Sequence, residues 1–554
     1  MDDAGRIATL AAAFGALSAN RFDLAATLSA PLIAANPDDT EALLLCGLAA
    51  GVTGHIQAAA HLLRSAARTR GDVVHPIHDL IGLLRRTGQT AAIEAHFNAA
   101  LRLEPADRAL LYGFGDFLYD SGRFADAVPV LEESLRGDPT HQPSRNLLAM
   151  TQAALGRTET AIEHLRHALR LDPYQARVWA NLGLLLKDDG GFGEAISAYD
   201  AALTLAPLDA QIRVNRVVAL LRAGLWADAW PDYEWRLRLA DQSVRPRLLP
   251  MLATLPDLFG MTILAVHEDG FGDTLHFARY LSALAARGAR VVAAVPPVLS
   301  RLIQRVEGVA AVCDVEDPWP AHDFYCPFFS LPRAFETTPE TIPAPIPYLR
   351  ADAVPVEDWR QRLPSAPLRV GLVWAGQARP MLPGFGVLDG RRSMALTAFA
   401  PLAEVPGVVF VSLQHGPEAV QAMTPPEGMT LFDPMGAVRS FADTAAIIAN
   451  LDLVIGVDTA VVHLAGGMGK PVFLLDRYDH CWRWLSGRTD SPWYPAMRIF
   501  RQTRIGDWSP VLRAVADALA EFASERAVAR ARECRAGDTG GRLVVEAGVE
   551  ARFE

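Results

Sequence analysis

At 554 residues the chain is too long for a single hydrophobic core, so several domains are expected. Its content of 51% hydrophobic and 21% charged residues is typical of a soluble globular protein. The net charge of −11 comes without any domain-wide basic excess, which argues against nucleic acid as the main partner.

The cysteines and the first residues indicate the compartment. The five cysteines form no CxxC pair and have no fixed spacing, a pattern typical of buried thiols in a reducing environment. The segment MDDAGRIATL is acidic where a secretory signal would be basic, and no apolar run is long enough to cross a membrane. We therefore expect a cytoplasmic protein without a transmembrane segment.

A glycine recurs every 34 residues through the first 240 residues. An alanine follows most of these glycines after five residues, and a proline follows most of them after seventeen. The glycine would close a turn between two helices, the alanine would permit their close packing, and the proline would end the second helix. The glycines are Gly54, Gly88, Gly122, Gly156, Gly190 and Gly224; the alanines are Ala25, Ala59, Ala127, Ala161, Ala195 and Ala229; the prolines are Pro37, Pro105, Pro139, Pro173 and Pro207.

This pattern resembles the tetratricopeptide repeat and implies an α-solenoid of about seven repeats over residues 1–240. Such an array usually binds a protein or peptide on its concave face; the alternative is that it only spaces or dimerises the molecule. Four aromatic residues crowd the last repeat, and we expect them to seal the array against the next domain. They are Trp226, Trp230, Tyr233 and Trp235.

Beyond the repeats, short β-branched runs alternate with helical stretches. Residues 241–258 are rich in proline and predict a linker. Strands at 261–266 and 291–295 flank a helix expected over 274–287, and further strands are expected at 408–413, 453–457 and 473–475. The alternation predicts two α/β domains with parallel sheets, over 259–365 and 366–530. The last of their helices is expected over 507–530, and a disordered tail over 531–554.

The segment 451–471, LDLVIGVDTAVVHLAGGMGKP, predicts a buried strand that turns directly into a helix. Small residues at 465–467 are expected where this helix lies close to the sheet. A helix start at the end of a strand offers N–H groups and a positive dipole end to an anion. The alternative is that Asp458 or Thr459 only caps the helix, and spacing alone does not separate the two.

Two other strand ends carry candidate functional residues. At the first, residues 268–273 hold two glycines and three carboxylates, including Glu268, and Asp273 is placed to act as a general base or to cap the following helix. His276 would share the face of Asp273, as a catalyst or as a polar neighbour. At the second, Gly376 precedes a long loop and the segment RRS, residues 391–393, whose arginines suit a diphosphate or form a solvated basic turn.

Five segments together resemble the glycosyltransferases related to lipopolysaccharide heptosyltransferases, and in particular the bacterial proteins that join tetratricopeptide repeats to such a domain. The resemblance spans about residues 260–508. It rests on HEDGFGDTLHFARYL at 267–281, GLVWAG at 371–376 with RRS at 391–393, FADTAA at 441–446, DLVIGVDTAVVHLAGGMGKPV at 452–472, and WRWLSGRTDSPWYPAMRIFRQ at 482–502. It implies a GT-B architecture, in which two Rossmann-like domains face a cleft. The combination with repeats is also similar to the eukaryotic O-GlcNAc transferase.

The resemblance implies an inverting transfer from a nucleotide-sugar donor, without a metal or cofactor, to a hydroxyl of a protein or of a glycan on a lipid carrier. Asp273 would be the base, with Glu268 and His276 beside it as catalytic candidates. The donor would be bound by Gly272, Gly376, Arg391, Arg392, Ser393, Asp458, Thr459, Ala460 and His463. The repeats would recruit the acceptor or a partner protein.

The sequence also departs from the pattern of this family. Asp269, Phe271 and Ala460 replace commoner residues, and the loop 377–390 is long and lacks the usual Asn-Pro. A second hypothesis is an inactive repeat scaffold whose GT-B domain only senses a nucleotide. An NAD-dependent oxidoreductase is disfavoured, because the glycines read GxGD rather than GxGxxG.

Overall fold

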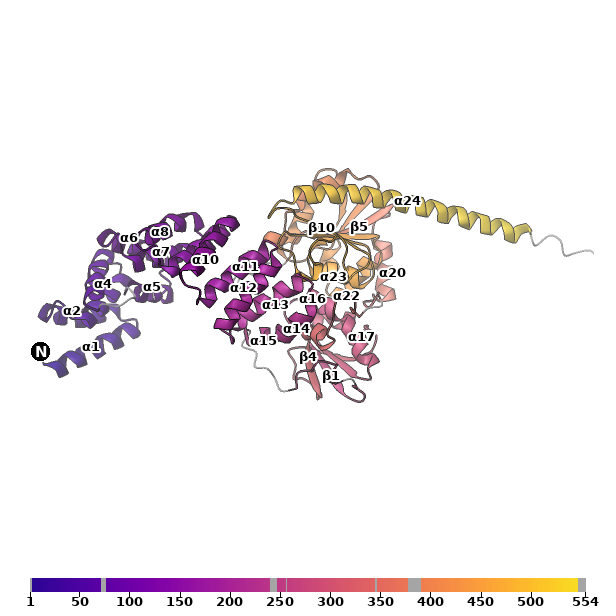
Figure 1. Cartoon of the computed structure of the whole chain (residues 1–554). Coiled ribbons are helices and arrows are strands. Elements are labelled where there is room, and N and C mark those ends of the chain that lie inside the picture. Colours follow the sequence, from indigo (N-terminus) through magenta and orange to yellow (C-terminus); the bar gives the residue numbers. More distant parts are fainter. Residues whose placement is uncertain are drawn as a thin grey trace, which may run out of the picture. The chain divides into compact units, whose positions relative to one another are not determined.

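The computed structural model describes residues 2–70, 76–239, 247–255, 257–343, 346–376 and 390–546 (Figure 1). The chain divides into two compact units, Met1–Leu208 and Asp209–Glu554, and each is described by itself. Within the described ranges, no helix is both long enough and apolar enough to cross a membrane. The predicted loop 377–390 lies outside the described residues except at its last position, as do residues 241–246 and 256 of the predicted linker.

The first unit is a series of antiparallel helix pairs. The glycines that recur every 34 residues adopt left-handed backbone angles, from φ 72° at Gly122 to φ 88° at Gly190, and close the turns within the pairs. The alanines five residues later are fully buried, and Ile93 is buried in the slot where alanine is missing. The helices are α1 (Asp3–Ser18), α2 (Phe22–Ala35), α3 (Thr40–Val52), α4 (Ile56–Arg70), α5 (Ile77–Arg86), η1 (Thr90–Ala92), α6 (Ile93–Leu103), α7 (Arg108–Asp120), α8 (Phe124–Gly137), α9 (Gln142–Ala154), α10 (Thr158–Leu171), α11 (Ala176–Asp188) and α12 (Phe192–Leu205). The predicted helical repeats are confirmed.

The second unit begins with the last helices of the repeat pattern: α13 (Ala210–Arg222), α14 (Trp226–Tyr233) and α15 (Arg236–Leu239). Gly224 closes the turn between α13 and α14 with φ 81°, and Ala229 is fully buried. The periodic sequence therefore crosses the boundary between the two compact units, and its last pair of helices packs with the α/β region.

Aromatic side chains join this last pair to the α/β region. The Trp226 ring stacks on Trp493, with 5.3 Å between centroids and an angle of 20°, and meets the edge of Trp482 at 5.5 Å. Trp230 Nε1 donates a 2.8 Å hydrogen bond to the carbonyl of Thr337. Trp235 lies instead between the guanidinium groups of Arg213 and Arg238. The predicted seal is confirmed for Trp226 and Trp230.

We expect Trp230→Phe to lower the free energy of unfolding by about 2 kcal/mol, because the Thr337 carbonyl loses its donor in a buried place. Trp235→Phe serves as the matched control with an expected loss of about 0.5 kcal/mol, since its ring is only partly buried between two cations. Urea unfolding followed by circular dichroism measures both. Equal losses in the two variants would contradict the proposed weight of the Trp230 hydrogen bond.

The first sheet has four parallel strands in the order β3-β2-β1-β4. Its strands are β1 (Thr262–Val266), β2 (Arg290–Ala294), β3 (Val309–Cys313) and β4 (Phe324–Pro327), and Ile263 pairs with Val291 on one side and Phe324 on the other. The accompanying helices are α16 (Phe271–Phe277), α17 (Arg279–Ala286), α18 (Pro297–Ile303), η2 (Phe328–Ser330), α19 (Leu331–Ala334) and α20 (Ala353–Arg362). The helix expected from residue 274 begins earlier, at Phe271, so Asp273 lies in its first turn.

The second sheet has six parallel strands in the order β10-β9-β8-β5-β6-β7. They are β5 (Leu368–Val373), β6 (Val408–Ser412), β7 (Leu431–Phe432), β8 (Leu453–Val457), β9 (Val472–Asp476) and β10 (Met497–Arg501). When β5 to β10 are renumbered 1 to 6 and the sheet is followed from its β7 edge, the order is 3-2-1-4-5-6. This is a doubly wound sheet, and its order reverses between β5 and β8. The other elements of this half are η3 (Leu396–Glu404), η4 (Pro417–Met423), η5 (Met435–Ala437), α22 (Phe441–Ala449), α23 (Ala460–Gly467), η6 (Trp482–Trp484) and α24 (Ser509–Glu546).

The last helix corrects one prediction. We expected disorder over 531–554, but α24 runs without a break to Glu546 (Figure 1). The segment ARARECRA at its centre consists almost entirely of alanine, arginine and glutamate, which have high helix propensity, and it continues a helix that is already formed. Residues 547–554 lie outside the described part of the chain.

Candidate functional site

The candidate site lies at the carboxyl ends of β5 and β8. These two strands are neighbours in the second sheet, and the strand order reverses between them. In open α/β sheets, ligands bind outside the carboxyl ends of strands at such a reversal. Residues 374–376 follow β5, and Asp458 and Thr459 follow β8, so the topology brings two predicted segments to one place.

Arg392 joins the ends of the two strands. Its guanidinium lies against Gly376 so closely that a Cβ at that position would come within 2.5 Å of Arg392 Nε. Arg392 Nη1 donates to the backbone carbonyl of Asp458 at 3.2 Å, and the Ser393 hydroxyl accepts from the N–H of Gly376 at 3.1 Å. A side chain at position 376 would therefore displace the guanidinium of Arg392.

Gln414, which we did not predict, fixes the end of β5. Its Oε1 accepts from the N–H groups of Trp374 and Ala375 at 3.0 and 2.9 Å, and its Nε2 donates to the carbonyl of Ala375. A buried amide that satisfies three backbone groups holds an irregular segment in one conformation. The sequence contains no periodic signal for this role, because Gln414 is 39 residues away from Ala375.

The start of α23 carries the other part of this cluster. Thr459 occupies the N-cap position, but its side chain makes no capping hydrogen bond. Its Oγ1 atom is buried and has no hydrogen-bond partner among the described residues. Asp458 does not cap the helix either, since its carboxylate Oδ1 lies 3.6 Å from His463 Nε2 on the same helix. The geometry therefore does not support the capping alternative for either residue.

Asp458 is held as a carboxylate. Burial alone would raise its pKa, but His463 and the guanidinium groups of Arg392 and Arg483 outweigh burial and hold the pKa below the ordinary value of 3.8. The cluster thus combines one fixed anion with the guanidinium groups of Arg392 and Arg483, beside a helix N-terminus without a side-chain cap.

Asp273 comes from the first sheet's side, in the first turn of α16. Its Oδ1 accepts a 2.6 Å hydrogen bond from Arg483 Nη2, which lies on η6, and 21% of the Asp273 side chain stays exposed. Burial raises the pKa of Asp273 above the ordinary 3.8, although the charge of Arg483 acts in the opposite direction. The carboxylate folds back over Gly270, where a Cβ would come within 2.8 Å of Asp273 Oδ2.

Gly272 has a packing role that we did not predict. A Cβ there would lie 3.2 Å from Ala460 Cα and 3.1 Å from His463 Cδ2. The residue therefore allows the start of α16 to lie directly against the start of α23. This contact brings Asp273, from the first half, to the same region as Asp458 and Thr459, from the second.

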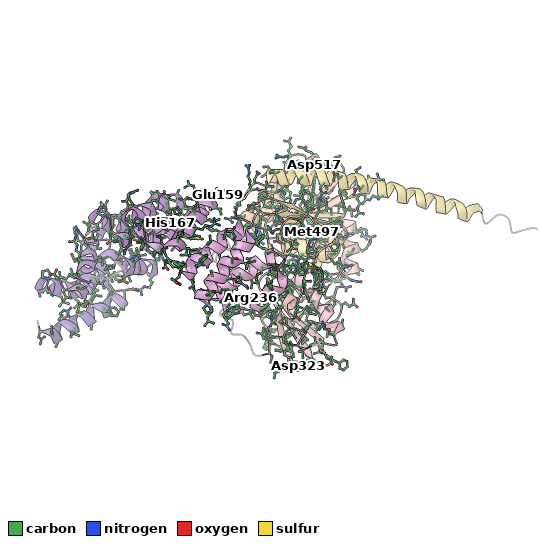
Figure 2. The ribbon with its side chains drawn as sticks, in the orientation of Figure 1. Glu159, His167, Arg236, Asp323, Met497 and Asp517 are labelled. Atoms are coloured by element: carbon green, nitrogen blue, oxygen red, sulfur yellow. The ribbon has the colours of Figure 1, made fainter. Side chains whose placement is uncertain are left out.

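Three predicted residues have partners that we did not expect. Glu268 forms a partly buried ion pair with Arg236 of α15 (labelled in Figure 2), at 2.9 Å between Arg236 Nη2 and Glu268 Oε2. Arg391 Nη1 pairs with Asp479 Oδ2 at 3.1 Å. His276 is fully buried, and its Nδ1 lies 2.8 Å from the hydroxyl of Tyr494. Burial and nearby cations hold the pKa of His276 well below 6.5, so the ring is neutral at pH 7. The ion pair between Glu268 and Arg236, described first, holds α15 against the first sheet.

Arg483 and Tyr494 belong to the site but were assigned no role from the sequence. Both fall within the segment 482–502 that carries part of the family resemblance. That segment has little regular structure apart from η6 and β10. No helical or strand period marks its side chains, so only the motif itself was a signal. Among the described residues, no group of three or more His, Cys, Asp or Glu side chains is arranged to hold a metal ion.

The chain thus combines tetratricopeptide repeats with an α/β region of two parallel sheets. Two family models described as tetratricopeptide repeat match it, one over residues 118–185 and the other over 82–142 and 181–238. Repeats of this kind indicate a protein partner.

Two curated proteins are similar to this chain. Protein FlbA of Caulobacter vibrioides is 28% identical over 483 residues, which cover 81% of this chain and 79% of FlbA. The probable UDP-N-acetylglucosamine–peptide N-acetylglucosaminyltransferase SPINDLY of Hordeum vulgare is 25% identical over 113 residues, which cover 19% of this chain and 12% of SPINDLY.

Solved structures with some likeness include MamA and YrrB. MamA is 21% identical, and the match covers 29% of this chain and 93% of MamA with a TM-score of 0.27. YrrB, described as a TPR protein with an unusual peptide-binding site, is 20% identical, and its match covers 33% of this chain and 91% of YrrB with a TM-score of 0.24. TM-scores of this size support no statement about function.

Proposed function

We propose that residues 209–530 form an inverting glycosyltransferase of the GT-B type, with a nucleotide-sugar donor and a hydroxyl acceptor. The observation that carries the proposal is the position of Arg392, against Gly376 and the Asp458 carbonyl at the reversal of strand order. A guanidinium beside the start of α23 suits a diphosphate, since both offer N–H donors to phosphate oxygens. The buried Thr459 hydroxyl supplies a further donor there.

Asp273 is the proposed general base. In the proposed step, the acceptor oxygen attacks the anomeric carbon of the donor sugar and its proton passes to Oδ2 of Asp273, the carboxylate oxygen that does not accept from Arg483 Nη2. The bond from the anomeric carbon to the phosphate oxygen breaks on the opposite face, and the nucleotide diphosphate leaves with that electron pair. Arg392 and the N–H groups of α23 offset the charge of the leaving group, so the proposed step invokes no metal or cofactor.

The repeats supply the proposed route to the acceptor. A tetratricopeptide array binds protein segments, so we propose that it recruits a protein acceptor, or a partner that presents a glycan on a lipid carrier, in the cytoplasm. The partial similarity to SPINDLY, whose name describes transfer of N-acetylglucosamine to a peptide, supports a protein acceptor. It also supports a UDP-sugar as the first donor to test.

A second candidate is a repeat scaffold that binds a nucleotide without turnover. The 2.6 Å ion pair between Arg483 and Asp273 favours it, because a carboxylate oxygen held by a guanidinium is a weaker base. The two candidates share the nucleotide site and differ only in whether sugar is transferred.

A thermal-shift screen tests the proposal. The purified protein is heated with UDP-, GDP-, ADP-, CMP- and dTDP-sugars and with the free nucleotides. A ligand present at about 100 times its dissociation constant adds about 2.7 kcal/mol to the free energy of unfolding, so one nucleotide class is expected to raise the melting temperature. If no nucleotide stabilises the folded protein, the glycosyltransferase proposal and the nucleotide-sensing alternative both fail.

A further inference from the structure

Three buried side chains, His276, Tyr494 and His463, lie in a row between α16 and Asp458, and we name this row the file. The hydroxyl of Tyr494 lies 2.8 Å from His276 Nδ1 and 2.9 Å from His463 Nδ1. His463 Nε2 in turn faces Asp458 Oδ1 at 3.6 Å. The exposed fractions of His276, Tyr494 and His463 are 0%, 1% and 4%, so water does not reach these contacts. Two histidines thus share one hydroxyl, which has a single proton.

The chemistry of the two ends fixes the direction of every hydrogen bond. Asp458 is ionised, so an unprotonated Nε2 of His463 would face a negative oxygen; the proton therefore lies on Nε2. An imidazolium at His463 would donate from Nδ1 as well, and the His276 proton would then lie on Nε2, which is buried without an acceptor among the described residues. We therefore infer a neutral His463 ring, whose Nδ1 accepts from the Tyr494 hydroxyl. The Tyr494 oxygen is left to accept from Nδ1–H of His276.

The far end of the file agrees with this direction. His276 Nε2 is buried and has no hydrogen-bond partner among the described residues. A buried N–H without an acceptor costs more than a buried lone pair, so the proton of His276 lies on Nδ1. The hydroxyl of Tyr348, 3.5 Å from that of Tyr494, donates to the carbonyl of Leu275 at 3.0 Å and does not compete for His463.

Close packing holds the three rings in place. The Tyr494 ring occupies the space that a Cβ at Gly466 would fill, 2.7 Å from its Cδ1 atom. Trp484 stacks on His463, with 5.4 Å between centroids and an angle of 17°, and Trp493 meets His276 at 4.4 Å. Gly466 thus leaves room for the Tyr494 ring, a role that we did not predict for it.

We propose that Tyr494 is a positioning residue for the nucleotide site, because it holds His463 as the Nε2–H tautomer that orients Asp458. The Asp458 carbonyl accepts from Arg392, so the file ends on the guanidinium assigned to the diphosphate. This inference rests on the proposed function for its role in binding. The tautomers themselves are a property of the protein without any ligand.

The first measurement is ¹⁵N NMR of the imidazole nitrogens in the histidine-labelled full chain, with assignments from His276→Gln and His463→Gln. We expect His463 to carry its proton on Nε2 and His276 on Nδ1 in the unaltered protein. A proton on Nδ1 of His463 would overturn the proposal. This spectrum needs no tyrosine variant and no nucleotide, so it decides the tautomers even if the protein transfers no sugar.

The second measurement compares Tyr494→Phe with Tyr280→Phe, a control that loses an equally buried hydroxyl bonded to Thr337. Calorimetric titration with UDP, GDP, ADP and dTDP measures affinity. We expect Tyr494→Phe to lower the affinity for the nucleotide that binds by about tenfold and to change the His463 signals. Tyr280→Phe is expected to change neither the affinity nor these signals. Unchanged His463 signals in Tyr494→Phe would overturn the proposal. If no nucleotide binds the unaltered protein, the proposed function fails. The arrangement of protons on His276, Tyr494 and His463 is then tested by the NMR measurement alone.

Discussion

Asp273→Asn is expected to lower the turnover of sugar transfer by about 10²- to 10⁴-fold, the usual contribution of a general base. The amide keeps the shape of the carboxylate but cannot take the acceptor's proton. Binding of the donor nucleotide is expected to stay within a few-fold, because Asp273 faces the acceptor and not the diphosphate in the proposed step. Steady-state kinetics and calorimetric titration of the same preparation separate the two effects.

The matched control for this variant is Asp269→Asn. Asp269 lies four residues earlier, with a left-handed φ of 62° that asparagine adopts as readily as aspartate. The variant removes the same charge from the same segment, so near-full turnover is expected. Near-full turnover in Asp273→Asn would remove Asp273 as the base and favour the scaffold alternative. The melting temperature must be checked in both, since Arg483 loses its partner in Asp273→Asn.

The pH profile of transfer gives a second check on Asp273. The base works only when it is deprotonated, so activity is expected to fall as the pH drops through the pKa of this group. Because burial raises that pKa, the fall should lie at a higher pH than the ordinary 3.8 of an aspartate. A fall centred at or below 3.8 would contradict the assignment.

Arg392→Ala is expected to weaken nucleotide binding about 100-fold and to abolish the thermal shift. A guanidinium that donates two hydrogen bonds to a diphosphate contributes about 3 kcal/mol, which corresponds to that change in dissociation constant. Arg392→Lys is expected to recover part of the loss, since an ammonium keeps the charge but not the planar fork.

Arg498→Ala is the control for Arg392→Ala. Arg498 is 53% exposed and lies near the start of β10, away from the carboxyl ends of the strands (Figure 2 labels its neighbour Met497). The Arg498→Ala variant removes the same charge from the same half of the α/β region, and its nucleotide affinity is expected to stay unchanged. Equal losses in the two variants would indicate an effect of net charge, and would contradict a specific contact of Arg392.

The parts of the fold that follow from local physics could be predicted. The 34-residue period was visible because each glycine answers a backbone requirement, a left-handed turn, that few other residues meet. The strand before Asp458 and the helix after it were predicted within a residue, because a buried run and a helical period meet there. Arg392 was selected because the segment RRS, residues 391–393, also carries part of the family resemblance.

The parts that depend on distant contacts could not be predicted. Arg483 reaches Asp273 across 210 residues of sequence, from a short turn without a period. Glu268 looked like a catalytic carboxylate because nothing in its own segment reveals Arg236, 32 residues earlier, as its partner. Gly272 was expected at the donor and Gly466 against the sheet, but the close neighbours of these two glycines are α23 and Tyr494.

The position of the last helix pair has a consequence for how such chains can be recombined. Trp226 and Trp230 of α14 are buried against Trp482 and Trp493, in the segment that carries Arg483. A cut at residue 240, where the periodic sequence ends, would expose these indoles and leave Glu268 without Arg236. A junction between Leu208 and Asp209 would keep the indole contacts and the Glu268–Arg236 ion pair within one unit. In a chimaera joined there, the final helix pair is therefore expected to stay with the α/β region.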